Sequence, residues 1–506
     1  MSGGAARLLF PAIRWVDGAG FAPAEDGIAA GLRMGAGGFI IFGGEAGAVR
    51  ALTTRLRGES AHPILIGADL ERGAGQQFDG ATRLPPLAAV GHVDDLEATR
   101  RCGALTAREA LALGVDWVYG PVADLDVEPR NPIIGTRSFG ARPGRAARHV
   151  RAWVEGCQDE GALACVKHFP GHGRTVTDSH AELPEVTAAG DVVRADMETF
   201  AAGISAGVAS VMTAHVSFPA LDPSGRPATL SPVILGEVLR GELGFGGLIV
   251  TDAMMMQGVV DAAAREGGGS AAAADPGALA AVRAIAAGCD ASLYPEDPAA
   301  VLEALGVALG DGSLDAGRVH ESVARIDAAA GAASAARERV QRSGQGWGVR
   351  SDAEWALDLA RRSLVPLAGS ATLRGEAVSV IDVDDDLGGP YPPPARAALP
   401  DRLRAAGPQV DHRSAPSEGG AETEHDGDRV IAVYADIRAW KGRPGLSDDA
   451  VAAVRAELSW TPDALVVLFG HPRLAGALDA GRMLAAWGGE SIMQQAVAAE
   501  MAGPSA

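Results

Sequence analysis

The sequence has few cysteines and no long apolar run. Its four cysteines, at positions 102, 157, 165 and 289, stand far apart in a chain of 506 residues. This spacing suits neither a metal cage nor a disulfide framework, and it favours reduced thiols. No stretch of about twenty apolar residues is present, and residues 1–15 contain no apolar segment of the signal-peptide type. We therefore expect a cytoplasmic protein that does not bind a membrane.

Positive charge is also scarce. The formal net charge is −20, with 64 Asp and Glu residues against 44 Lys and Arg. Nucleic acids and anionic membranes bind basic surfaces, so neither is expected as a partner. Only two residues are lysines, Lys167 and Lys441, in a chain that otherwise uses arginine. Lysine carries a compact ammonium, whereas arginine carries a planar guanidinium. Lys167 therefore indicates a specific need for an ammonium at that position.

The stretch from Lys167 to His180 concentrates the side chains that can carry chemistry. It runs Lys-His-Phe-Pro-Gly-His-Gly-Arg-Thr-Val-Thr-Asp-Ser-His and follows the apolar residues 162–166. A buried strand that ends in ionisable groups is typical of an active-site loop on a rigid scaffold. Asp178 and His180 are two residues apart, so the carboxylate can reach one imidazole nitrogen, fix the tautomer and leave the other nitrogen for proton transfer.

Two other interpretations of this stretch remain open at this point. One is a solvated loop without a function. The other is a metal site built from His168, His172 and His180, whose spacings of three and seven intervening residues match no common zinc signature. We therefore expect neither a metal ion nor another cofactor.

Apolar runs alternate with Ala-rich segments of helical periodicity, such as 95–113, 145–160 and 192–206. The candidate strands are residues 8–13, 38–42, 63–67, 117–121, 163–168, 210–214, 248–252 and 289–294. Eight strands separated by helices predict a (β/α)8 barrel of the TIM type with parallel strands. Polar residues follow five of these runs or end them, and barrel enzymes build their sites at that end of the strands. These residues are Asp69, Asp124, Lys167, His168, His215 and Asp252.

The stretch from Lys167 resembles the signature K-H-F-P-G-H-G-x-T-x-x-D-S-H-x-x-L-P of family 3 glycoside hydrolases, in particular of their β-N-acetylglucosaminidase branch. Four further segments are similar to family motifs and occur in the family's order: residues 68–71, 120–127, 131–140 and 251–256. The resemblance covers about residues 8–330 and extends weakly to the remainder.

The resemblance implies a role for each matched residue. Asp252 would be the catalytic nucleophile, and His180, paired with Asp178, the general acid/base. The residues that would hold the sugar are Asp69, Arg137, Lys167 and His168, with His215 and Met256 as further candidates; His215 is equally well explained as a strand cap. The sequence departs from the family's motifs at two places. Ala253 stands where the family has a second aspartate, and the segment 73–78 lacks the family's arginine. Both differences concern the aglycone side of the site.

The implied reaction is retaining, exo-acting cleavage of a terminal β-linked N-acetylglucosamine from a glycoside or muropeptide, through a covalent glycosyl-enzyme. In bacteria this points to peptidoglycan recycling. A histidine acid/base does not repel an anion, so phosphate could replace water and make the enzyme a phosphorylase. A non-catalytic sugar-binding protein and a metal-dependent barrel hydrolase are the alternatives from other classes.

A chain of 506 residues exceeds one hydrophobic core. We expect the catalytic barrel in residues 1–335, a linker and connecting helix in 336–365, and a smaller α/β sandwich in 366–506. Within the last part, strands are expected at 378–383, 429–435 and 464–469, and a surface loop at 411–428. The last barrel helix is expected at 313–330. The second domain has no catalytic constellation, so its predicted role is structural or in an oligomer contact.

Overall fold

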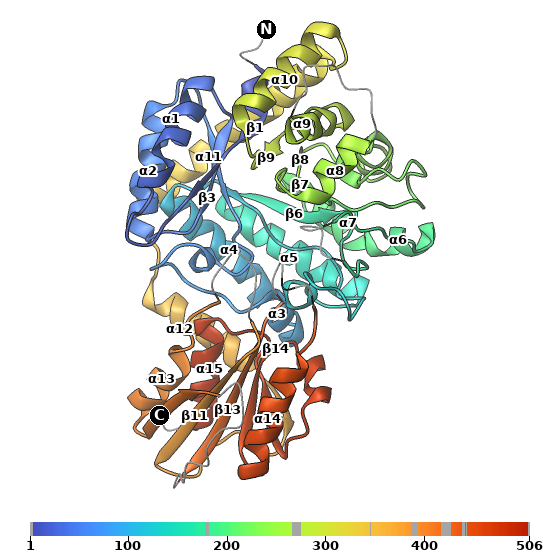
Figure 1. Cartoon of the computed structure of the whole chain (residues 1–506). Helices are drawn as coiled ribbons and strands as arrows, with labels where there is room; N and C mark the ends of the chain where they lie inside the picture. The colour runs from blue at the N-terminus through green and yellow to red at the C-terminus, as the bar shows by residue number, and fades with distance from the viewer. Residues whose placement is uncertain are drawn as a thin grey trace. The chain divides into compact units, whose positions relative to one another are not determined.

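The computed structural model describes residues 4–177, 182–265, 275–344, 346–386, 393–415, 427–437, 441 and 443–503. The chain forms two compact units (Figure 1). The first comprises Met1–Thr82, Leu96–Val127 and Ala141–Val349, and the second comprises Arg83–Asp95, Glu128–Gly140 and Arg350–Ala506. Two short segments from the first part of the sequence thus belong to the second unit.

The first unit is a ring of parallel strands. Seven strands form one sheet in chain order: β2 (Ala12–Arg14), β3 (Gly38–Phe42), β4 (Leu65–Ala68), β5 (Trp117–Val118), β6 (Leu163–Phe169), β7 (Ser210–Thr213) and β8 (Leu248–Val250). An isolated bridge from Val250 to Ala291 leads on to β9 (Ser292–Leu293), which pairs with β1 (Leu9–Phe10). Because only Pro11 separates β1 from β2, the ring returns to its start, and the predicted barrel is confirmed.

Helices follow the strands and surround the ring (Figure 1). The residues predicted as one helix at 192–206 form two, which meet at Met197. The helices of this unit, apart from the long α11, are α1 (Glu25–Met34), α2 (Ala46–Glu59), α4 (Leu96–Leu113), α5 (Pro143–Glu160), α6 (Gly190–Asp196), α7 (Glu198–Ser205), the π-helix Val233–Glu242, α8 (Gln257–Arg265), α9 (Pro276–Ala287) and α10 (Pro298–Asp311). Among the described residues, no helix combines the length and the apolarity needed to span a bilayer.

The helix α11 (Ala316–Ser343) is bound to the starts of the strands. Asp290, just before β9, accepts hydrogen bonds from Arg318 at 2.9 Å and from Arg325 at 3.1 Å, both on α11. Asp116, just before β5, pairs with Arg337 farther along the same helix. The helix runs well beyond the expected end at residue 330, because its Ala-rich sequence continues with good helix formers. Most of the predicted connector is therefore helix.

The second unit contains a six-stranded sheet in the order β10–β15–β14–β13–β11–β12. All neighbours are parallel except the edge pair β10 and β15. The strands are β10 (Val365–Ala368), β11 (Ala377–Asp384), β12 (Gln409–Ser414), β13 (Asp428–Ala435), β14 (Leu465–Gly470) and β15 (Arg482–Ala485); the helices are α3 (Leu87–Val93), α12 (Arg350–Arg362), α13 (Ala398–Ala406), α14 (Asp448–Trp460) and α15 (Ser491–Ala502). The expected α/β domain is confirmed.

The expected bounds of the surface loop 411–428 were wrong. The segment predicted as a surface loop begins with the last residues of β12 and ends at the first residue of β13; residues 416–426 lie outside the described part of the chain. β12 pairs with β11 alone, at the edge of the sheet, and most of its side chains are exposed. An edge strand needs little apolar surface, so the polar sequence of β12 carries no strand signal.

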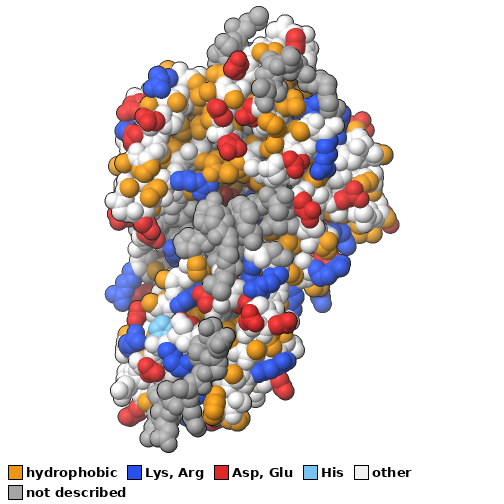
Figure 2. Space-filling model, in the orientation of Figure 1, with side chains coloured by type: hydrophobic (Ala, Val, Ile, Leu, Met, Phe, Trp, Pro, Cys, Tyr) orange, Lys and Arg blue, Asp and Glu red, His pale blue; other side chains and the backbone are white. Residues whose placement is uncertain are grey.

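Figure 2 shows how charge is distributed over one face of the molecule. Acidic side chains are spread among basic ones on this face and do not gather in a single patch. On this face the acidic charge is therefore dispersed and not concentrated in one place.

Candidate active site

Most of the predicted site residues of the first unit lie at one end of the barrel. Asp69 follows β4 directly, Lys167 and His168 belong to the end of β6, and Asp252 comes two residues after β8. Parallel strands bring their carboxyl ends to the same rim, where barrel enzymes place their chemistry. The peptide bonds Lys167–His168 and Phe169–Pro170 are cis.

Lys167 lies between two carboxylates. Its Nζ is 2.6 Å from Oδ1 of Asp69 and 2.7 Å from Oε1 of Glu71. The side chains of Lys167 and Glu71 are 3% and 5% exposed, whereas that of Asp69 is 30% exposed. A buried ammonium needs such partners, and Asp69 is the partner that a ligand can reach. Sequence reasoning assigned Glu71 no role; its position two residues after Asp69 was the available signal.

His168 is held by a second carboxylate at the same rim. Its Nδ1 is 2.7 Å from Oδ2 of Asp124. The same oxygen accepts the backbone N–H of His168, and Oδ1 of Asp124 accepts that of His172. Burial raises the pKa of the Asp124 carboxyl, but the rings of His168 and His172 and these hydrogen bonds outweigh burial, so the pKa lies below its usual value. An ionised Asp124 fixes the orientation of the imidazole, whose Nε2 lies 3.9 Å from Oδ2 of Asp252.

His172 is fully buried beneath this pair. Its Nδ1 is 2.8 Å from the hydroxyl of Thr175. Burial lowers the pKa of His172 to about 4, although Asp124 acts in the opposite direction, so the ring is neutral near pH 7. No group of three or more His, Cys, Asp or Glu side chains within the described ranges is arranged to hold a metal ion.

Asp252 lies on a turn that its neighbours hold in place. Its Oδ1 accepts the N–H of Ala253 at 2.7 Å, and its side chain is 25% exposed. The carbonyl of Ala253 lies 3.2 Å from Nε2 of His215, and Nδ1 of His215 is 2.7 Å from the hydroxyl of Thr229. Both ring nitrogens of the buried His215 thus contact protein oxygens. Through its contact with the carbonyl of Ala253, His215 helps to hold the turn that carries Asp252.

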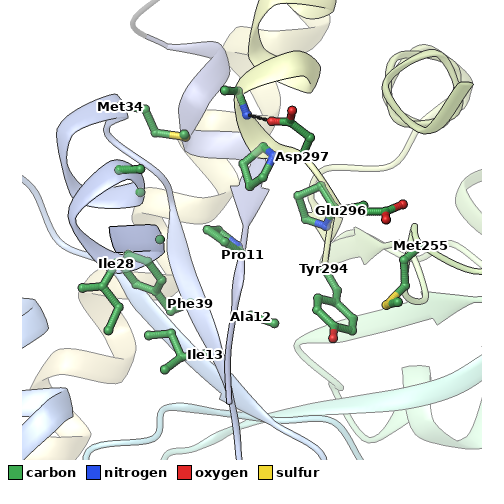
Figure 3. Close-up of a pocket in the computed structure, with 16 residues that line it drawn as sticks. Pro11, Ala12, Ile13, Ile28, Met34, Phe39, Met255, Tyr294, Glu296 and Asp297 are labelled. Atoms are coloured by element: carbon green, nitrogen blue, oxygen red, sulfur yellow. Dashed lines mark hydrogen bonds between the residues drawn. The ribbon is translucent and has the colours of Figure 1, made fainter. Parts of the chain in front are cut away.

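The methionines after Asp252 differ in exposure. Met254 and Met256 are buried, whereas Met255 is 44% exposed. Met255 also lines an apolar pocket of about 390 Å³ together with Tyr294 and residues of β2 and α1 (Figure 3). Of the predicted catalytic and sugar-binding residues that the structure describes, none lines this pocket.

Three further residues were predicted to belong to the site. Arg137 belongs to the second unit, at the end of the short 3₁₀ turn Gly135–Arg137, where its Nη1 donates to the carbonyl of Ile133 at 3.0 Å. Asp178 and His180 lie outside the described residues. In the first unit the structure therefore brings together Asp69, Lys167, His168 and Asp252, and it adds Glu71 and Asp124 to them.

A parallel barrel with carboxylates, a buried lysine and an oriented histidine at the carboxyl ends of its strands is the architecture of a barrel enzyme. The sequence model described as "Glycosyl hydrolase family 3 N terminal domain" matches residues 33–329, over half of the chain. The chain belongs to glycoside hydrolase family 3.

Several known proteins are similar to this chain. The β-hexosaminidase of Thiobacillus denitrificans is 38% identical over 257 residues, which cover 49% of this chain and 67% of the relative. That of Alkalilimnicola ehrlichii is 39% identical over 261 residues, covering 50% and 71%. A family 3 β-N-acetylglucosaminidase structure from Paenibacillus sp. superimposes with a TM-score of 0.81 at 27% identity, covering 98% of this chain and 95% of that one. The β-glucoside phosphorylase BglX, at 22% identity and a TM-score of 0.83, shares the fold.

Proposed function

We propose that this protein is a retaining, exo-acting β-N-acetylglucosaminidase. The observation that carries the proposal is the position of Asp252. Its carboxylate stands partly exposed at the end of β8, and Oδ2 is 3.9 Å from the Nε2 of His168. The nearby pair of Lys167 and Asp69 supplies both a donor and an acceptor for sugar hydroxyls. The names and folds of the relatives support the same activity.

The proposed reaction begins with attack of Asp252 on the anomeric carbon, which forms a covalent glycosyl-enzyme as the bond to the leaving oxygen breaks. His180, oriented by Asp178, gives its proton to the leaving oxygen and then takes one from the attacking water. These two roles rest on the sequence motif. His168 has a separate task, because Asp124 already fixes its ring: it binds the sugar beside the nucleophile.

Water is the proposed acceptor. At this rim, the described carboxylates of Asp69, Glu71, Asp124 and Asp252 face the ammonium of Lys167 and the ring of His168. Carboxylates outnumber cations in this set, and like charges repel at short range. A phosphate ion therefore meets an unfavourable field on its approach, which supports hydrolysis over phosphorolysis.

The test is release of p-nitrophenol from its β-N-acetylglucosaminide, with and without phosphate, with the sugar product identified. We expect free N-acetylglucosamine at a rate that phosphate does not change. A phosphate-stimulated rate with a sugar 1-phosphate as product would establish a phosphorylase instead. No turnover under either condition would favour a sugar-binding protein, and loss of turnover with a chelator would favour a metal-dependent hydrolase.

The natural substrate that we propose is a muropeptide with a terminal β-linked N-acetylglucosamine, handled in the cytoplasm during peptidoglycan recycling. The support is the β-N-acetylglucosaminidase branch that the motifs resemble. Incubation with a purified N-acetylglucosaminyl muropeptide should release N-acetylglucosamine at a higher kcat/KM than the p-nitrophenyl glycoside. A muropeptide that is not cleaved, beside a nitrophenyl glycoside that is, would contradict this substrate while leaving the activity intact.

A further inference from the structure

The loop that carries Arg137 belongs to the second compact unit. This loop, Glu128–Gly140, follows β5 in the chain and holds the whole motif that begins at Asn131. Internal hydrogen bonds give it shape: Oδ1 of Asn131 accepts the N–H groups of Ile133 at 2.9 Å and Ile134 at 2.8 Å. A loop of this length has no core of its own, so its position depends on what it packs against.

Gly135 marks the place where the loop is packed most tightly. A Cβ atom at this residue would lie 1.8 Å from Cδ1 of Ile437 and 3.5 Å from Nη2 of Arg473. The φ angle of Gly135 is +37°, a conformation that also favours glycine. Ile437 is buried and follows β13, a central strand of the sheet of the second unit. The backbone of Gly135 therefore rests directly on the side chain of Ile437.

A second close contact holds the other end of the loop. A Cβ atom at Gly91, on α3, would lie 2.3 Å from the carbonyl oxygen of Phe139. α3 belongs to the same unit as the loop. The loop is thus fixed before and after Arg137, and the contact with Ile437 acts on the turn that contains Arg137, because Gly135 and Arg137 form the same turn.

We propose that Ile437 is a positioning residue for Arg137. The contact of Ile437 with Gly135 sets the position of the turn, and the turn sets the direction of the guanidinium. This inference rests on the proposed function, in which Arg137 contacts the sugar. It assigns to Ile437 a role in substrate affinity.

The test compares Ile437→Ala with Ile431→Ala in the full-length protein. Ile431 lies on β13, is also buried and packs in the core of the second unit, so both variants remove the same atoms from buried positions of the same unit. Both should lower Tm. Only Ile437→Ala should raise KM for the p-nitrophenyl glycoside, by about tenfold, since small misplacements of a substrate-positioning group are costly. Should either alanine variant fail to fold, Ile437→Val and Ile431→Val replace the pair.

Amide hydrogen exchange supplies a readout that does not depend on turnover. Peptides covering residues 128–140 should exchange faster in Ile437→Ala and at the wild-type rate in Ile431→Ala. Gly135→Ala should raise KM, and adding Ile437→Ala should partly restore it, because the shorter side chain leaves room for the new methyl group. Wild-type KM and wild-type exchange in Ile437→Ala would overturn the inference.

Arg137→Ala separates this inference from the proposed function. If Arg137→Ala raises KM and Ile437→Ala does not, the activity stands and the positioning role of Ile437 is wrong. If Arg137→Ala keeps the wild-type KM, Arg137 does not bind the sugar and the inference falls, while the enzyme activity is unaffected. If the wild-type protein cleaves neither glycoside, the proposed function fails and the inference fails with it.

Discussion

The two lysines of the chain lie in sites built from similar groups. The side chains of Lys167, in the first unit, and Lys441, in the second, are each 3% exposed. Each ammonium contacts two carboxylates: Lys167 those of Asp69 and Glu71, at 2.6 and 2.7 Å, and Lys441 those of Asp386 and Asp385, at 3.3 and 3.8 Å. In both sites a buried lysine ammonium lies between two carboxylates.

The surroundings of the two lysines differ. Asp69 is partly exposed, whereas Asp385 and Asp386 are buried. Asp385 also binds Arg443 at 2.6 Å, and Asp386 binds Arg396 at 2.7 Å. The carboxylates of the second unit are thus held by arginines as well as by lysine, whereas Asp69 can turn to a ligand. A scarce lysine marks a need for a buried ammonium, and exposure of its partner carboxylate distinguishes the proposed binding site from the structural one.

The largest effect is expected from carboxylate-to-amide changes in the two regions. Asp252→Asn should lower kcat/KM by roughly 10⁴-fold or more, because an amide does not attack the anomeric carbon, and it should leave Tm unchanged or higher. Asp386→Asn should keep the kinetics and lower stability by roughly 3 kcal/mol, because it leaves Arg396 and Lys441 without their buried partner. Activity assays and thermal unfolding check both variants. An active Asp252→Asn would show that the carboxylates of the two regions do not differ in this way.

As the pH falls, the first unit should lose stability before the second. The pKa of His172 is about 4 in the folded chain against 6.5 ordinarily, so below pH 6.5 the unfolded chain binds a proton that the folded chain does not. Stability should therefore fall by roughly 3 kcal/mol between pH 6.5 and 4. In the second unit the pKa of Asp385 lies below its usual 3.8, because Arg443 and Ser447 outweigh burial, so its contribution is present above pH 3.8 and lost only as pH falls through that lowered pKa.

Hydrogen exchange at pH 7, 5.5 and 4.5 measures the two units separately. His172→Asn should reduce the loss of stability in the first unit over this range. Earlier loosening of the second unit would show that its ion pairs, and not the buried imidazole, limit the tolerance of the protein to acid.

Replacing each lysine by arginine compares the two lysine sites without changing their charge. Lys167→Arg should lower kcat/KM by roughly tenfold to 100-fold, the value of one charge-assisted hydrogen bond, because the planar guanidinium does not fit between Asp69 and Glu71 in the same way. Lys441→Arg should lower Tm and leave kcat/KM unchanged. Equal kinetic losses in the two variants would mean that the scarcity of lysine says nothing about the binding site.

The smallest effect is expected at the buried partner of Lys167. Glu71→Gln keeps a hydrogen-bond acceptor and removes the charge, so kcat/KM should fall about tenfold or less. The loss should appear mainly in KM, because Glu71 acts through Lys167 and does not touch the anomeric carbon. A larger loss in kcat than in KM would indicate that Glu71 takes part in the chemistry itself.

The barrel could be predicted because each of its strands is a buried apolar run bounded by turns. The parallel strands β11, β13 and β14 of the second unit were predicted for the same reason. The edge strands β10 and β12 were missed, because half-exposed positions leave no apolar pattern. The rim position of Asp69, Lys167, His168 and Asp252 followed from strand ends alone, once the strands were assigned to a parallel barrel.

Contacts between distant residues could not be predicted in the same way. Asp124 and His168 are 44 positions apart, and their pairing depends on the register of β5 and β6. The membership of residues 128–140 in the second unit had no sequence signal, since the segment stands between two barrel strands in the chain. His215 shows the same limit: its hydrogen bond to the carbonyl of Ala253 joins two loops that only the fold brings together.

In the proposed reaction Asp252 forms a covalent bond with the sugar. This bond can be detected by mass spectrometry after incubation with a 5-fluoro N-acetylglucosaminyl fluoride, which forms a glycosyl-enzyme faster than it loses one. We expect one added sugar per chain, on the peptide that contains Asp252, and no label in Asp252→Asn. A labelled peptide from another part of the chain, or an unlabelled protein that still hydrolyses the nitrophenyl glycoside, would contradict it.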